Sequence, residues 1–395
     1  MRIMLLGGGG FIGRHIMAGL LAAGHEVVCV VRTSRDVATA FPQASFLQLD
    51  LASATDQRDW EARLHGIECI VNTAGILRGA QMDAIHVHMP KALYAAALTV
   101  GIRQVVLISA ISARADVATD YSQSKLSGEE ILRQSGLGWT ILRPSLVYAE
   151  GSYGGTSLLR GMAALPCWVP LPGNGEFGFT PIHARDLARG VVEICGNPNF
   201  YGKALEPVGP QSLSLRELLT RYRAWLGFGR TRFISIPMPL MGIFARMGDV
   251  FGDGPVSSNS LAQLVAGNAG DSTAFAKAIG FLPRSLDEAM LAHPADVQDR
   301  WHARLFFLAP AIKIVLIVLW LASALLGLVW GSEAAQAVTT GLGLQQAWAE
   351  PLRLTGSAID LGVALSILFD RRAYRSMAIQ LAVVFCYTAV LSLAL

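Results

Sequence analysis

The sequence predicts an α/β protein with a doubly wound parallel sheet and a small second lobe, followed by an all-α transmembrane helical domain. Three observations carry this prediction. Short apolar runs alternate with amphipathic stretches up to about Val147, a glycine-rich turn follows the first run, and the chain becomes strongly apolar after Arg304. Strands buried on both faces between helices are typical of parallel sheets.

Composition divides the chain into two parts. Hydrophobic residues make up 52% of the 395 residues and charged residues 15%, whereas soluble proteins carry roughly 25% charged residues. The deficit is concentrated in the C-terminal part. We therefore expect a cofactor-binding domain over residues 1–302, with a substrate lobe mainly over 148–302, and a membrane domain over 303–395.

Two classes of function are excluded at this point. The net charge of +3 comes from scattered basic residues, so nothing indicates nucleic-acid binding. The five cysteines form no CxxC pair and lack neighbouring histidines at zinc-ligand spacing, so we expect reduced thiols and no metal site.

The elements of the first part follow from hydrophobic periodicity. One helix is predicted after the glycine-rich turn, over residues 14–23, and another over residues 215–225 of the lobe. Glycine and proline become frequent after Tyr148, which suits a smaller lobe of loops and short elements that covers a substrate. Six strands are expected: Ile3–Leu6, Val27–Val31, Phe46–Leu49, Cys69–Asn72, Val105–Ser109 and Thr140–Leu142.

Three apolar segments are expected to span a bilayer: residues 305–329, 354–369 and 377–395. The weakly apolar stretch 334–347 is expected to form an interfacial or re-entrant helix.

The basic residues of the loops orient these spans. Arg300 and Arg304 precede the first span, Arg371, Arg372 and Arg375 separate the last two, and the loop 331–351 contains no Lys or Arg. Because basic loops remain in the cytoplasm, we expect a multi-pass protein of the cell inner membrane with a cytoplasmic N-terminal domain.

Two ionisable residues lie within the predicted spans, Lys313 and Asp360. Counted from the cytoplasmic ends at about 1.5 Å per residue, their depths in the bilayer are similar. We therefore predict that they pair between antiparallel spans, while the alternative is that Lys313 reaches the membrane interface by itself.

The glycine-rich turn has the pattern of a dinucleotide-binding loop of the Rossmann type. Gly7, Gly10 and Gly13, with Phe11 and Ile12 between the last two, follow a strand and open a helix. Glycines allow the backbone to approach a pyrophosphate, which the helix N-terminus then binds.

The residues after the second strand indicate which cofactor is preferred. A NAD-binding protein usually has an acidic residue there for the ribose 2′-hydroxyl, whereas this chain has Arg32 and Arg35. Arginine matches a 2′-phosphate. We therefore predict NADP(H), with NAD(H) as the alternative.

Further cofactor contacts are expected at the ends of the third and fourth strands. Asp50 and Leu51 follow the third strand and could reach the adenine. Asn72, Ala74 and Gly75 follow the fourth strand and would run under the cofactor.

Tyr121 and Lys125 are the predicted catalytic pair. Their spacing places both side chains on one face of a helix. A lysine beside a phenol can lower the phenol's pKa and hold the nicotinamide ribose. Tyr121 could then exchange a proton with a carbonyl oxygen while the cofactor carries a hydride.

These elements, with Arg143 and Pro144 in the segment Leu-Arg-Pro-Ser, resemble the extended and atypical branch of the short-chain dehydrogenase/reductase superfamily over about residues 1–300. The segment from Val106 to Ala113 is similar to the subgroup related to the NADPH-binding accessory subunit of respiratory complex I. The tail, notably from Ala358 to Gly362, resembles DoxX-like membrane domains.

The resemblance implies an oxidoreductase with Arg143 and Pro144 beside the cofactor, but the chain departs from the pattern in two places. Extended members carry a serine where this chain has Ala110, which leaves Ser109 or Ser112 to contact the substrate carbonyl. DoxX-like domains usually have four helices, whereas three spans are predicted here.

Three functions follow as expectations. The first is a membrane-anchored NADP(H)-dependent oxidoreductase that acts on a small apolar carbonyl, alcohol or activated alkene, with membrane lipid as its surroundings. The second, favoured by Ala110, is a non-catalytic NADPH-binding subunit of a membrane protein complex. The third is an NAD-dependent nucleotide-sugar epimerase or dehydratase, which the two arginines argue against.

Overall fold

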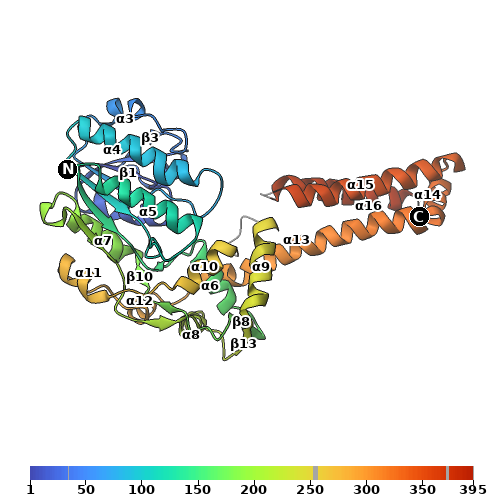
Figure 1. Cartoon of the computed structure of the whole chain (residues 1–395). Coiled ribbons are helices and arrows are strands. Elements are labelled where there is room, and N and C mark those ends of the chain that lie inside the picture. Colours follow the sequence, from blue (N-terminus) through green and yellow to red (C-terminus); the bar gives the residue numbers. More distant parts are fainter. Residues whose placement is uncertain (34, 252–256, 371–372, 395) are drawn as a thin grey trace. The chain divides into compact units, whose positions relative to one another are not determined.

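The computed structural model of the 395-residue chain describes all residues except 34, 252–256, 371–372 and 395. The chain forms two compact units, Met1–Ala303 and Arg304–Leu395, which Figure 1 shows in the colours of the sequence. They are called the N-terminal and C-terminal units below.

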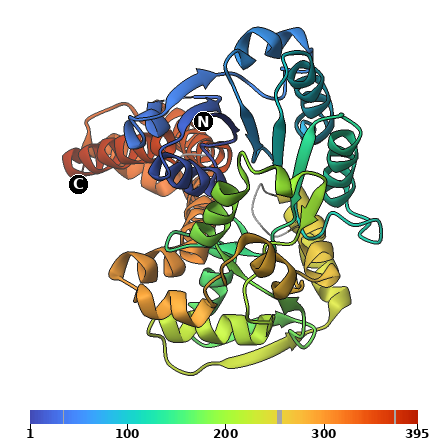
Figure 2. The same ribbon diagram turned by 90° about the vertical axis from the view of Figure 1, so that its left-hand side faces the viewer.

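A seven-stranded sheet is the centre of the N-terminal unit, and all of its neighbouring strands are parallel. Its spatial order is β11-β6-β5-β4-β1-β2-β3, and Figure 2 shows it from the side. The strands are β1 (Arg2–Leu6), β2 (Glu26–Val31), β3 (Ser45–Gln48), β4 (Cys69–Asn72), β5 (Gln104–Ile108), β6 (Gly138–Leu142) and β11 (Lys203–Leu205).

Alternate side chains of β1 enter two different cores, one on each face of the sheet. Ile3 and Leu5 pack with helices α1 (Phe11–Ala22) and α7 (Ala184–Ile194). Met4 and Leu6 pack on the opposite face, where α3 (Arg58–Glu61), α4 (Met89–Thr99) and α5 (Asp120–Arg133) lie. Burial on both faces is the reason that the strands read as continuous apolar runs. The predicted fold class is confirmed.

Each of the six predicted strands is present, with ends that differ by at most two residues. The seventh strand, β11, was not predicted. It has three residues, two of them exposed, so it offers no periodicity that could distinguish it from a loop.

The lobe is built from paired short strands and small helices. Its strand pairs are β7 (Val147–Tyr148) with β10 (Ile182–His183), β8 (Trp168–Pro172) with β13 (Arg232–Ile236), and β9 (Gly178–Phe179) with β12 (Leu213–Ser214). Its helices are α6 (Gly155–Ala163), α8 (Leu215–Trp225), α9 (Met238–Phe251), α10 (Ser258–Ala266), α11 (Ser272–Ile279) and α12 (Leu286–Ala292). Helix α8 coincides with the helix predicted over residues 215–225. A capping box of Ser214 and Glu217 fixes its start.

Four helices make up the C-terminal part: α13 (Val297–Trp330), α14 (Ser332–Gly341), α15 (Ala349–Phe369) and α16 (Tyr374–Ala394). Helices α13 and α16, and the helical stretch Gln346–Phe369, are long and apolar enough to cross a membrane. The short helix α14 overlaps the stretch 334–347, which was expected to form an interfacial or re-entrant helix.

The predicted pairing of Lys313 with Asp360 is wrong. The Nζ of Lys313 donates to the main-chain oxygens of Leu368 and Asp370, at 3.4 and 3.3 Å. Asp360 instead accepts hydrogen bonds from Ser323 (2.6 Å) and Tyr387 (2.8 Å).

The register of the helices explains this error. Because α13 runs antiparallel to α15, the level of Lys313 is the C-terminal end of α15, about 15 Å along the helix from Asp360. The predicted pairing requires the end of α15 to be level with residue 305, whereas its last carbonyl groups are level with Lys313, and Asp360 is level with Ser323. The lysine therefore satisfies carbonyl groups at a helix end, where a cation is favourable.

Candidate functional site

The glycine-rich turn connects β1 to α1 in a shape that only glycine permits. Gly7 has a φ of +75°, and its carbonyl oxygen accepts a hydrogen bond of 2.9 Å from the amide of Gly10. A Cβ atom on Gly13 would collide with that same carbonyl oxygen. The turn and the first turn of the helix are therefore packed backbone against backbone.

The N-terminus of α1 carries donor groups suited to a phosphate. Gly10 is the N-cap and provides no side-chain hydrogen bond, and the first turn holds no acidic residue. Phe11 and Ile12 are half-buried there, and the Phe11 ring stacks on Tyr153 with centroids 6.4 Å apart. Free amides and the positive end of the helix dipole favour an anion, so this cradle fits the pyrophosphate of a dinucleotide.

The residues predicted to choose between NADP and NAD follow the carboxyl ends of β2 and β3. Arg32 is exposed immediately after β2, and Arg35 is the first residue of α2 (Arg35–Ala40); the side chain of Arg35 lies outside the described part of the structure. Asp50 is exposed after β3 and accepts a hydrogen bond of 3.2 Å from the amide of Ala52, while Leu51 is half-buried.

The segment after β4 is held in a fixed turn. The side-chain oxygen of Asn72 accepts a hydrogen bond of 3.0 Å from the amide of Ala74, and its nitrogen donates to Tyr94 at 3.3 Å. The hydroxyl of Thr73 donates to the carbonyl of Leu6 at 2.6 Å. These bonds tie the segment to β1, beside the glycine-rich turn.

Tyr121 and Lys125 lie one turn apart on α5. Thr119 caps this helix by accepting a hydrogen bond of 3.1 Å from the amide of Ser122. The Tyr121 ring is half-buried, and the loss of water around the phenol raises its pKa to about 12. The phenol is therefore protonated at neutral pH in this structure.

The ammonium group of Lys125 joins the ends of two neighbouring strands. Its Nζ donates to the carbonyl oxygens of Ile108 (3.2 Å) and Ala74 (3.4 Å). The side chain is 6% exposed; burial lowers its pKa to about 8, although the charge of Glu129 acts in the opposite direction. A Cβ atom on Gly75 would lie 3.0 Å from this Nζ, so the glycine gives the lysine access to the backbone.

His86 completes the surroundings of this pair. It lies in the π-helical turn Ala84–His88 that precedes α4. Its Nε2 accepts a hydrogen bond of 3.2 Å from the amide of Ile76, so its Nδ1 carries the proton that is shared with Ser124 at 2.8 Å. Burial, and then the charge of Lys125, lower the pKa of His86 to about 3. A neutral imidazole therefore bridges the segment after β4 to α5.

Ser109 and Arg143 belong to a different group of side chains. Ser109 donates a hydrogen bond of 2.6 Å to the fully buried carboxylate of Glu129. Arg143 and Arg133 donate to the same carboxylate, at distances of 2.6 to 2.9 Å. The Ser109 hydroxyl is thus engaged in an ionic network rather than with Tyr121.

Ser112 and Pro144 lie in the loops after β5 and β6, which are adjacent. The amide of Ile111 donates to the carbonyl of Pro144 at 3.1 Å, and the carbonyl of Ser112 accepts from the amide of Arg114 at 2.8 Å. Ser112 is buried. Both loops, like the glycine-rich turn, follow the carboxyl ends of parallel strands in one sheet. This end of the sheet is where α/β proteins bind their ligands.

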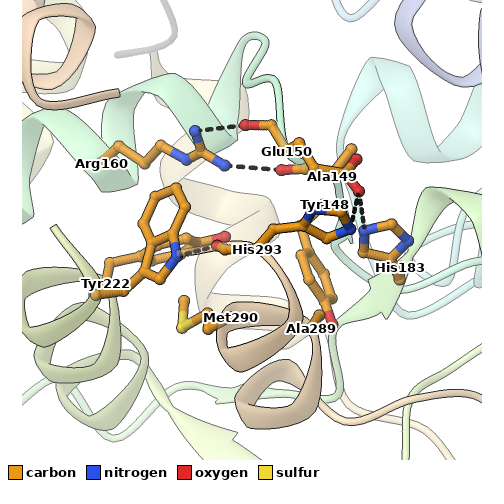
Figure 3. Close-up of a pocket in the computed structure, with 10 residues that line it drawn as sticks. Tyr148, Ala149, Glu150, Arg160, His183, Tyr222, Ala289, Met290 and His293 are labelled. Atoms are coloured by element: carbon orange, nitrogen blue, oxygen red, sulfur yellow. Dashed lines mark hydrogen bonds and ion pairs between the residues drawn. The ribbon is translucent and has the colours of Figure 1, made fainter. Parts of the chain in front are cut away.

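A cavity lies in the lobe, and Figure 3 shows its lining. Arg160 donates to the main-chain oxygens of Ala149 (2.7 Å) and Glu150 (2.9 Å). The Glu150 carboxylate faces two imidazoles, with 3.2 Å to the Nε2 of His293 and 3.7 Å to that of His183. Neither predicted catalytic side chain of α5 is part of this lining.

Several residues of these arrangements were not expected from the sequence. They are His86, Glu129 and Arg160. Each has a partner between 20 and 139 residues away in the chain, and no local spacing could reveal these contacts. His183 lines the lobe cavity.

Comparison with known families matches the two parts of the chain separately. Residues 7–198 match the family described as NAD(P)H-binding, and residues 317–395 match the DoxX-like family. The match to the second family and the three apolar helices indicate association with a membrane.

Individual relatives are distant. The chain is 25% identical over 222 residues to NADH dehydrogenase [ubiquinone] 1 alpha subcomplex subunit 9, mitochondrial, of Dictyostelium discoideum, covering 54% of this chain and 61% of that protein. It is 24% identical over 240 residues to a ceramide reductase of Caulobacter vibrioides, covering 60% and 74%. The chain thus spans about three fifths of the length of the Dictyostelium relative.

The fold also matches solved structures. A nucleoside-diphosphate-sugar epimerase from Staphylococcus aureus superposes with a TM-score of 0.60 at 20% identity, over 73% of this chain and 99% of that one. At this identity the likeness concerns the fold alone.

The fold and the glycine-rich turn define a nucleotide-cofactor-binding protein of the α/β class. More specifically, residues 7–198 are similar to NAD(P)H-binding proteins and residues 317–395 to the DoxX-like family, and the proteins that resemble the chain include a reductase.

Proposed function

We propose that this chain is a membrane-anchored, NADP(H)-dependent oxidoreductase that acts on an apolar carbonyl, alcohol or activated alkene. The observation that carries the proposal is the arrangement of Tyr121 and Lys125 on α5, with the Lys125 ammonium at the carboxyl ends of β4 and β5. Residues 1–302 would perform the reaction, and residues 303–395 would anchor it.

The cofactor preference rests on the residues around the glycine-rich turn. The cradle of Gly7, Gly10 and Gly13 would hold the pyrophosphate. Arg32 is exposed at the position where NAD-binding proteins carry an acid, and it would pair with a 2′-phosphate. When bound, the nicotinamide supplies or accepts the hydride.

The protein's own part in the reaction is to hold and move a proton. With a pKa near 12, Tyr121 keeps its proton at neutral pH and could donate it to a substrate oxygen that gains negative charge. The nearby Lys125 ammonium would stabilise the phenolate that remains. His86 and Ser124 would fix the position of α5 against the segment after β4.

The substrate class and the location follow from the membrane domain. A chain with three membrane-spanning helices would meet apolar substrates in or beside the lipid. The ceramide reductase relative, whose name describes a reaction on a lipid, supports the same class. The basic loops favour the cell inner membrane with the N-terminal unit in the cytoplasm.

The test is oxidation of NADPH by the detergent-purified full chain with long-chain ketones, aldehydes and quinones as acceptors. Tyr121→Phe removes only the hydroxyl and should lower kcat about 100-fold or more, the usual contribution of a general acid. Tyr201→Phe, in the turn before β11, is the matched control and should keep the wild-type rate. Full activity of Tyr121→Phe would contradict the mechanism.

A second candidate is a non-catalytic NADPH-binding subunit of a membrane complex. Two observations favour it: Ala110 replaces the expected serine, and the hydroxyl of Ser109 is bound to Glu129. The mitochondrial relative is named as a subunit of NADH dehydrogenase. This candidate predicts retained NADPH without turnover on any acceptor, and many turnovers by the isolated chain would exclude it.

A further inference from the structure

Helix α9 has its apolar side chains on the outside. Leu240, Ile243, Phe244 and Met247 are 41%, 54%, 44% and 50% exposed. Their spacing of three and four residues places them on one face of the helix. A helix of a soluble protein normally turns such a face to the core.

The opposite side of α9 packs on the protein with small residues. Ala245 is 3% exposed, and Gly242 is half-buried. At about 100° per residue, Ala245 points roughly 150° away from the centre of the apolar face. Helix α9 thus packs on the protein through small side chains and exposes its large apolar side chains.

The strand that precedes α9 and the strand paired with it also expose large apolar side chains. Only Pro237 separates α9 from β13, which pairs with β8. Trp168 on β8 and Ile234 on β13 are 49% and 45% exposed. Large clustered apolar groups on a surface mark a site of contact with a protein or a membrane.

The charges around the apolar face favour a membrane. Arg246 is exposed and lies at the flank of the face, roughly 110° from its centre. The only acidic residue of α9 is Asp249, which lies on the opposite side and accepts a hydrogen bond of 3.0 Å from the amide of Ser258. With Arg246 beside the apolar face and Asp249 on the opposite side, the helix suits a lipid surface with anionic headgroups.

The chain itself brings this unit to a bilayer. Helix α13 begins inside the N-terminal unit at Val297 and runs as one helix to Trp330, and its later part is apolar enough to cross a membrane. Few residues therefore separate the N-terminal unit from the lipid. We propose that α9 lies in the interface of the bilayer with Leu240, Ile243, Phe244 and Met247 among the lipid chains.

This proposal rests on the membrane anchoring in the proposed function, and not on catalysis. If the oxidoreductase function also holds, the docked helix gives the N-terminal unit direct contact with the pool of apolar substrates. The partner is a lipid surface, recognised by apolar burial and by the charge of its headgroups.

The experiment places a fluorophore sensitive to its surroundings on single cysteines of the full chain in lipid nanodiscs with one copy each. The exposed native cysteines are first removed by Cys167→Ser and Cys386→Ser. Ile243→Cys and Met247→Cys probe α9. Leu98→Cys, 53% exposed on α4, is the matched control, and Val318→Cys on α13 reports insertion.

Lipids that carry a nitroxide on their acyl chains should quench the probes at positions 243, 247 and 318, and leave the probe at position 98 bright. Quenching at 318 but not at 243 and 247 would overturn the docking and leave the anchoring intact. A blue-shifted but unquenched probe on α9 would mean that protein covers it, which also overturns the proposal. An unquenched probe at 318 would overturn the anchoring itself.

Discussion

Lys125 in the N-terminal unit and Lys313 in the C-terminal unit use their ammonium groups in the same way. Each donates two hydrogen bonds to main-chain carbonyl oxygens at the end of a secondary-structure element. For Lys125 these are the ends of two parallel strands, and for Lys313 the end of α15. The two lysines differ in what lies beside them.

Lys125 is buried beside a neutral histidine and one helical turn from Tyr121, in a position that glycine leaves open. Lys313 is half-buried among helices and binds carbonyl groups that a helix end leaves without partners. Under the proposed function the same contact would support chemistry in the N-terminal unit, whereas in the C-terminal unit it caps a helix.

The largest expected effect comes from removing one ammonium group at a time. Lys125→Met should lower kcat about 100-fold or more, because the phenolate of Tyr121 loses its nearby charge. Lys313→Met should leave kcat unchanged and lower the stability of the C-terminal unit by about 1 kcal/mol, as expected for a lost hydrogen-bonded helix cap. NADPH oxidation and thermal unfolding in detergent measure the two effects. If Lys125→Met and Lys313→Met lost activity equally, the two lysines would not differ in role as proposed.

Cofactor binding should depend on one glycine of the turn and not on its neighbour. A Cβ atom on Gly13 would collide with the carbonyl of Gly7, whereas one on Gly9 would lie 3.4 Å from Val37 in ordinary contact. Overpacking costs about 1–3 kcal/mol, so Gly13→Ala should weaken NADPH binding about tenfold to hundredfold. Calorimetric titration of both variants tests this, and strong binding by Gly13→Ala would contradict the placement of the pyrophosphate.

Arg32 should matter for one of the two dinucleotides. A hydrogen bond to a charged group contributes about 1.5–3 kcal/mol, so Arg32→Ala should weaken NADPH binding about tenfold to hundredfold and leave NADH binding unchanged. NADH is the internal control of the same titration. An equal loss for both cofactors would remove Arg32 from the 2′-phosphate site.

The pH dependence separates the charge of Lys125 from its shape. With its pKa lowered to about 8 by burial, the ammonium is present below pH 8 and lost above it. The value of kcat/KM should therefore fall about tenfold per pH unit above pH 8. In Lys125→Arg the guanidinium stays charged, so the residual activity should lack this limb. If activity of Lys125→Arg still fell above pH 8, a group other than Lys125 would cause the decline.

Local pattern was sufficient for the α/β fold and for the glycine-rich turn. Doubly buried strands and a glycine turn at a helix start are encoded in neighbouring residues, and six strands were placed to within two residues. Strand β11 was missed because it has only three residues, two of them exposed, which show no hydrophobic periodicity.

Contacts between distant residues could not be predicted. The burial of Glu129 among Ser109, Arg143 and Arg133 depends on how three elements pack, and the partners of Lys313 and Asp360 depend on helix register. The sequence can locate an ionisable group on a helix, but the partner of that group depends on the register between this helix and its neighbour.

The most direct test of the central claim is native mass spectrometry of the full chain released from detergent micelles. We expect a bound species with the mass of NADP(H), retained by the wild type and by Gly9→Ala and lost in Gly13→Ala. A bound species with the mass of NAD(H), or no dinucleotide in the wild type after incubation with NADPH, would contradict the account.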